Sequence, residues 1–285
     1  MDTRSPRVIG EPATDFFIDA VTRLERASIG YLMGGAFAYS AYTHVDRQTG
    51  DFDIFMRLDD VPRALDLFHA VGYQSELRFP HWLAKVSCDD HFIDVIFSSG
   101  NGVARVDDLW FAHAVDATVL GHKTRLCPPE ELIWSKAYVQ ERERFDGADV
   151  LHLLRELGPA LDWERLLMRF ADHWRVLFSH IVLFGFVYPD RRQQIPSWVV
   201  RTLVQRFVAE EPEPEHRVCY GTLLSREQYL WDTERADYRD ARVEPHGPMT
   251  QAETDSWTAA IGEHTRKPSD TRQAPTRYRL QASHR

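Results

Sequence analysis

Residues 31–57 read YLMGGAFAYSAYTHVDRQTGDFDIFMR, and this stretch decides the fold. Its first apolar run ends in Gly34 and Gly35, which predicts a strand that enters a tight turn. Residues 36–43 then predict a short helix, and residues 51–57 alternate polar and apolar side chains as a strand does. A strand, a glycine turn, a helix and a second strand are typical of a mixed α/β domain.

Helical and strand patterns continue on both sides of this stretch. Helices are expected at residues 15–27, 60–71, 130–145, 149–157, 163–186 and 197–210, and strands at residues 82–87 and 91–97. The predicted fold class is therefore α/β (α+β), with a small mixed sheet of four or five strands and flanking helices. A mainly helical region and a flexible basic tail follow the sheet.

The change of pattern at Cys127 suggests three parts of the chain. They are an α/β domain at residues 1–127, a helical domain at 128–215, and an extended segment with a mobile tail at 216–285. The tail is expected from about Ala241. The segment from Cys219 to Arg242 is rich in Tyr and Arg, and either closes over a cleft as a lid or strap, or packs as a surface connector.

Charge and composition narrow the function. The 285 residues carry a net charge of −9, yet residues 266–285 alone are net +5 and the rest is net −14. An acidic body does not bind nucleic acid by bulk electrostatics, so it would need a local basic surface or metal ions. The three cysteines are far apart, which argues against a disulfide framework or a cysteine-based zinc site.

Apolar runs argue against a membrane protein. The longest, Ile181 to Tyr188, is far shorter than the roughly 20 residues that span a bilayer. Because residues 1–12 have no apolar stretch, a secretory signal is not expected. We expect a cytoplasmic protein with no membrane partner.

Acidic residues on the predicted strands suggest metal chemistry. Asp51 and Asp53 are two residues apart, so their side chains should share one face of a strand, about 6.6 Å apart. Two such carboxylates suit Mg²⁺ or Mn²⁺, although the pair alone is more typical of a solvated strand edge. Asp94 lies inside an apolar strand. It either completes a three-carboxylate cluster or pairs with a nearby Lys or Arg.

The combination of motifs resembles the nucleotidyltransferase superfamily with the polymerase-β-like fold. More closely, it is similar to the minimal, abortive-infection-toxin-type branch. The resemblance covers roughly residues 28–155. Its motifs are the glycine pair, the run Arg47-Gln-Thr49-Gly-Asp51-Phe-Asp53, the strand Asp94, and the helix with Lys136 followed by Arg144-Phe-Asp146-Gly-Ala-Asp149.

The resemblance implies roles for particular residues. Metal binding and catalysis are implied for Asp51, Asp53 and Asp94, and nucleotide binding for Gly34, Gly35, Arg47, Thr49 and Lys136. Mg²⁺ or Mn²⁺ is the implied cofactor and an NTP, with ATP a candidate, the implied substrate. Lys136 has a simpler alternative as a surface lysine on an amphipathic helix. Ala36 departs from the Ser or Thr that many members carry after the glycine pair.

The implied reaction is transfer of NMP from an NTP to a hydroxyl, with release of pyrophosphate. The acceptor stays open between RNA, protein and a small molecule, and a protein partner is possible. The alternative is a catalytically silent module that senses a nucleotide or binds a protein. A dinucleotide-binding oxidoreductase is excluded, since no G-x-G-x-x-G follows the first strand.

Overall fold

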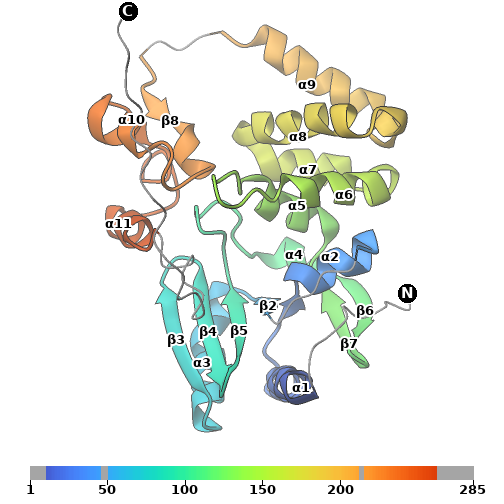
Figure 1. The fold of residues 1–285 in the computed structure, drawn as a ribbon, viewed down its shortest axis with the longest axis vertical. Coiled ribbons are helices and arrows are strands. Elements are labelled where there is room, and N and C mark those ends of the chain that lie inside the picture. The colour runs from blue at the N-terminus through green and yellow to red at the C-terminus, as the bar shows by residue number, and fades with distance from the viewer. Residues whose placement is uncertain (1–10, 46–50, 212–214, 262–285) are drawn as a thin grey trace, which may run out of the picture.

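The central sheet has seven strands in the order β3-β4-β5-β2-β1-β7-β6 (Figure 1). The computed structural model describes residues 11–45, 51–211 and 215–261. The strands are β1 (Leu32–Met33), β2 (Phe52–Phe55), β3 (Gln74–Phe79), β4 (Leu83–Cys88), β5 (His91–Ile96), β6 (Val115–Val119) and β7 (His122–Leu126). Two pairs are parallel, β1 with β7 and β2 with β5, and the other neighbours are antiparallel. The sheet is mixed, as predicted.

Helices surround the sheet and then form a stack of their own above it (Figure 1). They are α1 (Glu11–Arg26), α2 (Gly35–Thr43), α3 (Val61–Ala70), α4 (Asp108–Ala112), α5 (Pro129–Ala137), α6 (Gly147–Leu157), α7 (Trp163–Phe170), α8 (Trp174–Val187) and α9 (Ser197–Ala209). The last elements are β8 (Val218–Cys219), α10 (Leu230–Arg235), β9 (Arg239–Asp240) and α11 (Gln251–Ala259). The predicted α/β part followed by a helical region is confirmed, whereas the domain boundaries stay a prediction.

The two faces of the sheet differ because side chains alternate along each strand. On β2, Phe52 and Ile54 are fully buried, and Phe52 stacks on Phe17 of α1 with ring centroids 4.3 Å apart. Asp53, between them, points to the opposite face and is only partly buried. Phe52 and Ile54 therefore face the part of the core that α1 covers, and Asp53 lies on the opposite face of the sheet. The hydrophobic core continues from the sheet into the helical stack.

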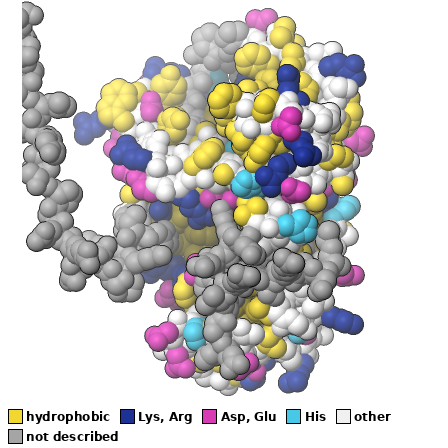
Figure 2. All heavy atoms as spheres, turned by 45° about the vertical axis from the view of Figure 1, so that its right-hand side comes forward, with side chains coloured by type: hydrophobic (Ala, Val, Ile, Leu, Met, Phe, Trp, Pro, Cys, Tyr) yellow, Lys and Arg dark blue, Asp and Glu magenta, His cyan; other side chains and the backbone are white. Residues whose placement is uncertain are grey.

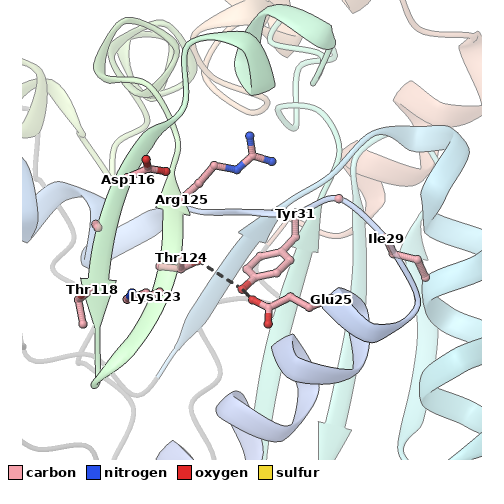
Figure 3. A pocket seen from close by; sticks show the side chains of 10 residues that line it. Glu25, Ile29, Tyr31, Asp116, Thr118, Lys123, Thr124 and Arg125 are labelled. Carbon is pink, nitrogen blue, oxygen red and sulfur yellow. Dashed lines mark hydrogen bonds between the residues drawn. The ribbon is translucent and has the colours of Figure 1, made fainter.

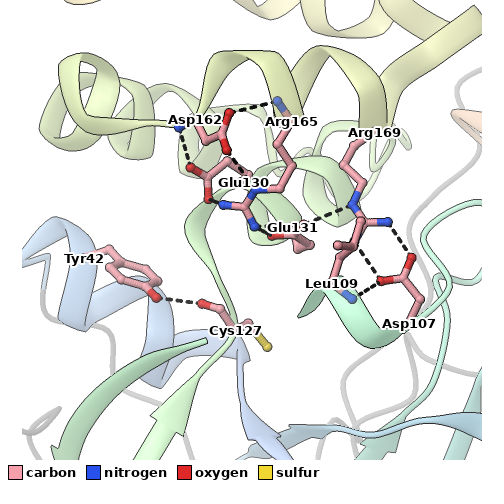
Figure 4. Close-up of polar contacts among 9 residues, drawn as sticks. All are labelled: Tyr42, Asp107, Leu109, Cys127, Glu130, Glu131, Asp162, Arg165 and Arg169. Atoms are coloured by element: carbon pink, nitrogen blue, oxygen red, sulfur yellow. Dashed lines mark hydrogen bonds and ion pairs between the residues drawn. The ribbon is translucent and has the colours of Figure 1, made fainter. Parts of the chain in front are cut away.

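A buried ionic cluster joins α5 and α7 to the start of α4 (Figure 4). Glu131 of α5 is fully buried and binds both Arg165 and Arg169 of α7, at 3.0 Å each. Arg169 also binds Asp107, the N-cap of α4, through two hydrogen bonds of 2.6 and 2.8 Å. Glu130 accepts a hydrogen bond from Arg165 at 2.5 Å. These contacts fix α5, and hence its Lys136, relative to α7 and the start of α4.

Three strands of the central sheet escaped the sequence analysis, so the expected four or five strands were too few. β3, β6 and β7 have many exposed residues. The only buried residue is Phe79 in β3 and Val119 in β6. Strands with little buried surface have no clear alternation of apolar and polar residues. The predicted strand at 51–57 is also shorter, because β2 comprises only Phe52–Phe55.

Two predicted helices are wrong in extent. The helix expected at 130–145 ends at Ala137, and Gln140 and Phe145 pair instead across a tight turn. That turn is rich in charge and lacks a helical apolar face. The helix expected at 163–186 is interrupted between α7 and α8, where Ala171 has a φ of 39°. The positive φ at that residue ends α7.

The expectation of a mobile tail from about Ala241 is also wrong for the first part of that segment. Thr250 and Glu253 form a capping box at the start of α11. Trp257 of α11 packs against Phe79 and Trp82, with ring centroids 5.0 and 5.1 Å apart. The basic residues 266–285 lie outside the described residues.

Apolar side chains remain exposed on the helical stack, as Figure 2 shows over its upper part. On α8 and α9 these include Val182, Phe186, Phe207 and Val208, of which Phe186 is 82% exposed. The sequence of α8 is apolar around nearly its whole circumference, so packing one side leaves the other in water. In the described parts of the chain, no helix has the length and apolar character needed to cross a membrane.

The ionic cluster yields a stability prediction. Glu131→Gln removes the charge that neutralises Arg169 and Arg165, while the two guanidinium groups stay buried. We expect the free energy of unfolding to fall by about 3 kcal/mol, measured by urea denaturation. Glu164→Gln, at an exposed position of α7, is the control and should change it by less than about 0.5 kcal/mol. Equal effects of both substitutions would contradict the role given to the cluster.

Candidate active site

A row of charged side chains crosses three neighbouring strands on the face of the sheet opposite α1. Asp53 of β2 lies in register with Asp94 of β5, and Asp94 lies in register with Lys85 of β4. Residues in register on adjacent strands share a face, and their backbones are about 4.8 Å apart. The Nζ atom of Lys85 lies 2.6 Å from an oxygen of Asp94. The order across the sheet is therefore carboxylate, carboxylate, ammonium.

The glycine pair lets the start of α2 approach Asp53 closely. A Cβ atom at Gly35 would lie 1.7 Å from Oδ2 of Asp53, and Gly35 has a φ of 52°. A Cβ atom at Gly34 would lie 2.2 Å from the ring of Phe55. No larger residue fits either position as the chain stands. The amide of Gly34 donates to the carbonyl of Asp53 at 3.0 Å, so this amide serves the fold and is not directed at a ligand.

Burial and neighbouring charge alter the chemistry of Asp53. Burial raises its pKa to about 6, and the nearby carboxylates of Asp94 and Asp51 act in the same direction. The positive charges of Lys136 and Arg144 act in the opposite direction. Burial and the two neighbouring acids thus outweigh Lys136 and Arg144 in their effect on the pKa of Asp53.

A second group of charges lies where α5 meets α6. Lys136 binds Asp146 at 3.0 Å and Asp149 at 2.8 Å. Arg144 binds Asp146 with two hydrogen bonds of 3.0 and 2.9 Å. Although burial opposes ionisation, the hydrogen bonds of Arg144 and the charge of Lys136 lower the pKa of Asp146 to about 2. Since Lys136 and Arg144 also act on Asp53, this group lies close to the row on the sheet.

The donor set suits a divalent cation such as Mg²⁺. That ion prefers oxygen ligands and usually takes one or two protein carboxylates, with water and phosphate oxygens completing its shell. Asp53 and Asp94 provide two carboxylates side by side. Within the described ranges, however, no group of three or more His, Cys, Asp or Glu side chains is arranged to hold a metal ion. The three-carboxylate cluster stays a prediction: Asp51 precedes β2 and is exposed, and Asp94 pairs with Lys85.

The predicted nucleotide-binding residues fall into two groups. Gly34, Gly35 and Lys136 lie near Asp53, whereas Arg47 and Thr49 lie outside the described residues. Sequence reasoning missed Lys85. Its only signal was a lysine in the otherwise apolar run Leu83-Ala-Lys-Val86, together with the expectation that Asp94 might meet a basic partner.

A separate cavity lies at the other end of β1 (Figure 3). Its lining includes Glu25 of α1, Tyr31 before β1, and Thr124 and Arg125 of β7. Tyr31 donates to Glu25 at 2.8 Å and accepts a hydrogen bond from Thr124 at 3.3 Å. The glycine pair follows β1 in the sequence, whereas the lining residues Ile29, Gly30 and Tyr31 come before it. None of the predicted site residues lines it.

Comparison with known proteins gives distant structural likenesses. No family model matches the sequence, and no curated protein matches it. The chain is similar to the antibiotic-resistance factor ANT(2'')-Ia, with 14% identity and a TM-score of 0.42, over 60% of this chain and 98% of that chain. It is also similar to the lincosamide antibiotic adenylyltransferase LnuA bound to lincomycin, with 15% identity and a TM-score of 0.36, over 51% of this chain and 96% of that chain.

A nucleotidyltransferase of Thermotoga maritima described as putative gives 14% identity and a TM-score of 0.34, over 42% of this chain and 80% of that chain. These likenesses connect the chain with structures of nucleotidyltransferases. All of these TM-scores lie below 0.5.

The contact between Gly35 and Asp53 can be tested by a matched pair of substitutions. Gly35→Ala adds a methyl group that overlaps the carboxylate, and it also strains the backbone at positive φ. Gly72→Ala introduces the same kind of strain, since Gly72 has a φ of 88°, but meets no atom within 4 Å. We expect Gly72→Ala to cost about 1 kcal/mol and Gly35→Ala about 1–3 kcal/mol more, by urea denaturation. Equal losses would contradict the close contact.

The raised pKa of Asp53 predicts a pH dependence of stability. Because folding raises this pKa from 3.8 to about 6, the folded state binds the proton more tightly, and stability falls as the pH rises through this range. Asp53→Asn removes this dependence. Its Tm should exceed that of the wild type by about 3 °C near pH 8, and by much less near pH 4, in scanning calorimetry without divalent cations. A constant difference across pH, or the same trend in Asp66→Asn, would contradict the assignment.

Proposed function

We propose that this chain is a nucleotidyltransferase that depends on a divalent cation and transfers NMP from an NTP to a hydroxyl group. The observation that carries the proposal is the in-register pair of Asp53 and Asp94, with the start of α2 held against Asp53. Two carboxylates beside the N-terminus of a helix form a place where a cation and phosphate groups can be bound together.

Different residues of the site would bind the cation and the phosphate groups. Asp53, with Asp51, would hold Mg²⁺ or Mn²⁺, and Gly35 at the first turn of α2 would approach the phosphates. When bound, the cation supplies neutralisation of the phosphate charge and polarisation of the phosphoryl oxygens. Lys136 has three N–H donors, and a phosphate oxygen would compete with Asp146 and Asp149 for them.

The transfer itself needs one proton acceptor. The acceptor hydroxyl oxygen attacks the α-phosphorus of the NTP, and the bond from this phosphorus to the oxygen that bridges to the β-phosphate breaks. Pyrophosphate leaves with the bonding electrons, and the proton of the hydroxyl passes to the carboxylate of Asp94. Asp94 suits this role because it lies beside Asp53 on the same face of the sheet.

A second candidate is a catalytically silent module that binds a nucleotide. The ion pairs of the site favour it, because Lys85 already neutralises Asp94, and Lys136 already binds Asp146 and Asp149. Such pairs let the acids persist without a metal. The kind of acceptor (RNA, protein or small molecule), the likeness to the toxin-type branch and a protein partner all stay predictions.

The proposal is tested by a transfer assay. The full chain is incubated with each of the four labelled NTPs, Mg²⁺ or Mn²⁺, and a cell extract that is then resolved into RNA, protein and small molecules. We expect label in one fraction, and a loss of at least about a hundredfold in Asp53→Asn, because the cation loses its main ligand. Asp66→Asn, exposed on α3, should keep full activity.

The outcomes separate the two candidates. Label transfer by Asp53→Asn at the wild-type rate would refute the nucleotidyltransferase. Absence of label in every fraction, together with an increase of the Tm on addition of NTP, would favour the silent module.

A further inference from the structure

Lys85 is held in place from two sides. Its Nζ atom lies 2.6 Å from Oδ1 of Asp94 and 4.1 Å from the centroid of the Phe92 ring. Phe92 and Asp94 are two residues apart on β5, so both face the same side as Lys85. A cross-strand ion pair and a cation–π contact therefore keep the ammonium beside the carboxylate row.

The position of Lys85 matters for the number of cations that the row can bind. Asp53 and Asp94 together would attract two divalent ions, as sites for phosphoryl transfer often do. A second ion bound to Asp94 would lie within a few ångströms of the ammonium of Lys85. Like charges at this distance repel strongly where side chains are partly buried, and Lys85 and Asp94 are 30% and 21% exposed.

We propose that Lys85 replaces the second divalent cation, so that the site binds a single cation through Asp53 and keeps Asp94 for the acceptor hydroxyl. This inference rests on the proposed function, because it assigns roles within the same site. A carboxylate has about four lone-pair positions, so an ammonium on one oxygen leaves Asp94 able to accept a proton. Lys85 is thus a positioning residue that acts through Asp94.

Mn²⁺ binding tests the proposal without relying on turnover. Free Mn²⁺ is measured by electron paramagnetic resonance in titrations of the full chain with Mn²⁺ alone. The wild type should bind one ion. Lys85→Gln should bind a second ion, or bind the first on the order of tenfold more tightly, because the repelling charge is gone. The Tm of each variant in the absence of metal shows that it is folded.

Two variants serve as matched controls. Lys85→Arg keeps the positive charge and should bind Mn²⁺ as the wild type does. Lys123→Gln removes a lysine from an exposed position of β7 and should also leave binding unchanged. If Lys85→Gln fails to fold, Lys85→Met, which can keep its contact with Phe92, replaces it. The proposal would be overturned if Lys85→Gln, or Lys85→Met in its place, bound the same number of Mn²⁺ ions with the same affinity as the wild type. Binding of two ions by the wild type would also overturn it.

Asp53→Asn separates a failure of this inference from a failure of the proposed function. If Asp53 is the main ligand, this substitution removes Mn²⁺ binding whatever residue stands at position 85. Wild-type Mn²⁺ binding by Asp53→Asn would refute the metal site of the proposed function. Loss of binding in Asp53→Asn, with no effect of Lys85→Gln, would refute only the role given to Lys85.

Discussion

The carboxylate of Asp53 sets the constraint on which the site depends. A largely buried carboxylate is unfavourable unless a positive group compensates it, and burial together with the neighbouring acids raises the pKa of Asp53 despite the charges of Lys136 and Arg144. The same carboxylate lies where a Cβ atom at Gly35 would be, so α2 can begin there only with glycine. One side chain thus determines the residue at the start of a helix and creates a need for positive charge.

Two ionic groups of the protein differ in burial and in the balance of their charges. The cluster of Glu131, Arg165 and Arg169 is deeply buried, and each charge has an opposite charge within 3.0 Å. It holds α5 and α7 together and binds the N-cap of α4. The row of Asp53, Asp94 and Lys85 is partly exposed and carries one more acid than base. The excess of negative charge in the row, on an accessible face, favours binding of a cation. The charges of the Glu131 cluster are already paired, so this cluster stabilises the fold.

The sequence predicted local features better than long-range ones. The glycine turn, α2 and the alternation at Asp53 follow from the residues themselves, and they are confirmed. The register of Asp94 with both Asp53 and Lys85 could not be predicted, because it depends on which strands become neighbours. The break at Ala171 also has no local signal, because alanine favours a helix and rarely takes the positive φ that it has here.

The ion pairs also limit when a nucleotide can bind. Lys136 is shared by two carboxylates, and Asp146 is held by Arg144 as well. A triphosphate without a cation would have to take these basic groups from their acids and would also face the negative charge of Asp53. A triphosphate bound with a divalent cation brings a positive charge toward that carboxylate, which removes the repulsion. The charge arrangement around Asp53 therefore favours the metal–nucleotide complex over the free nucleotide.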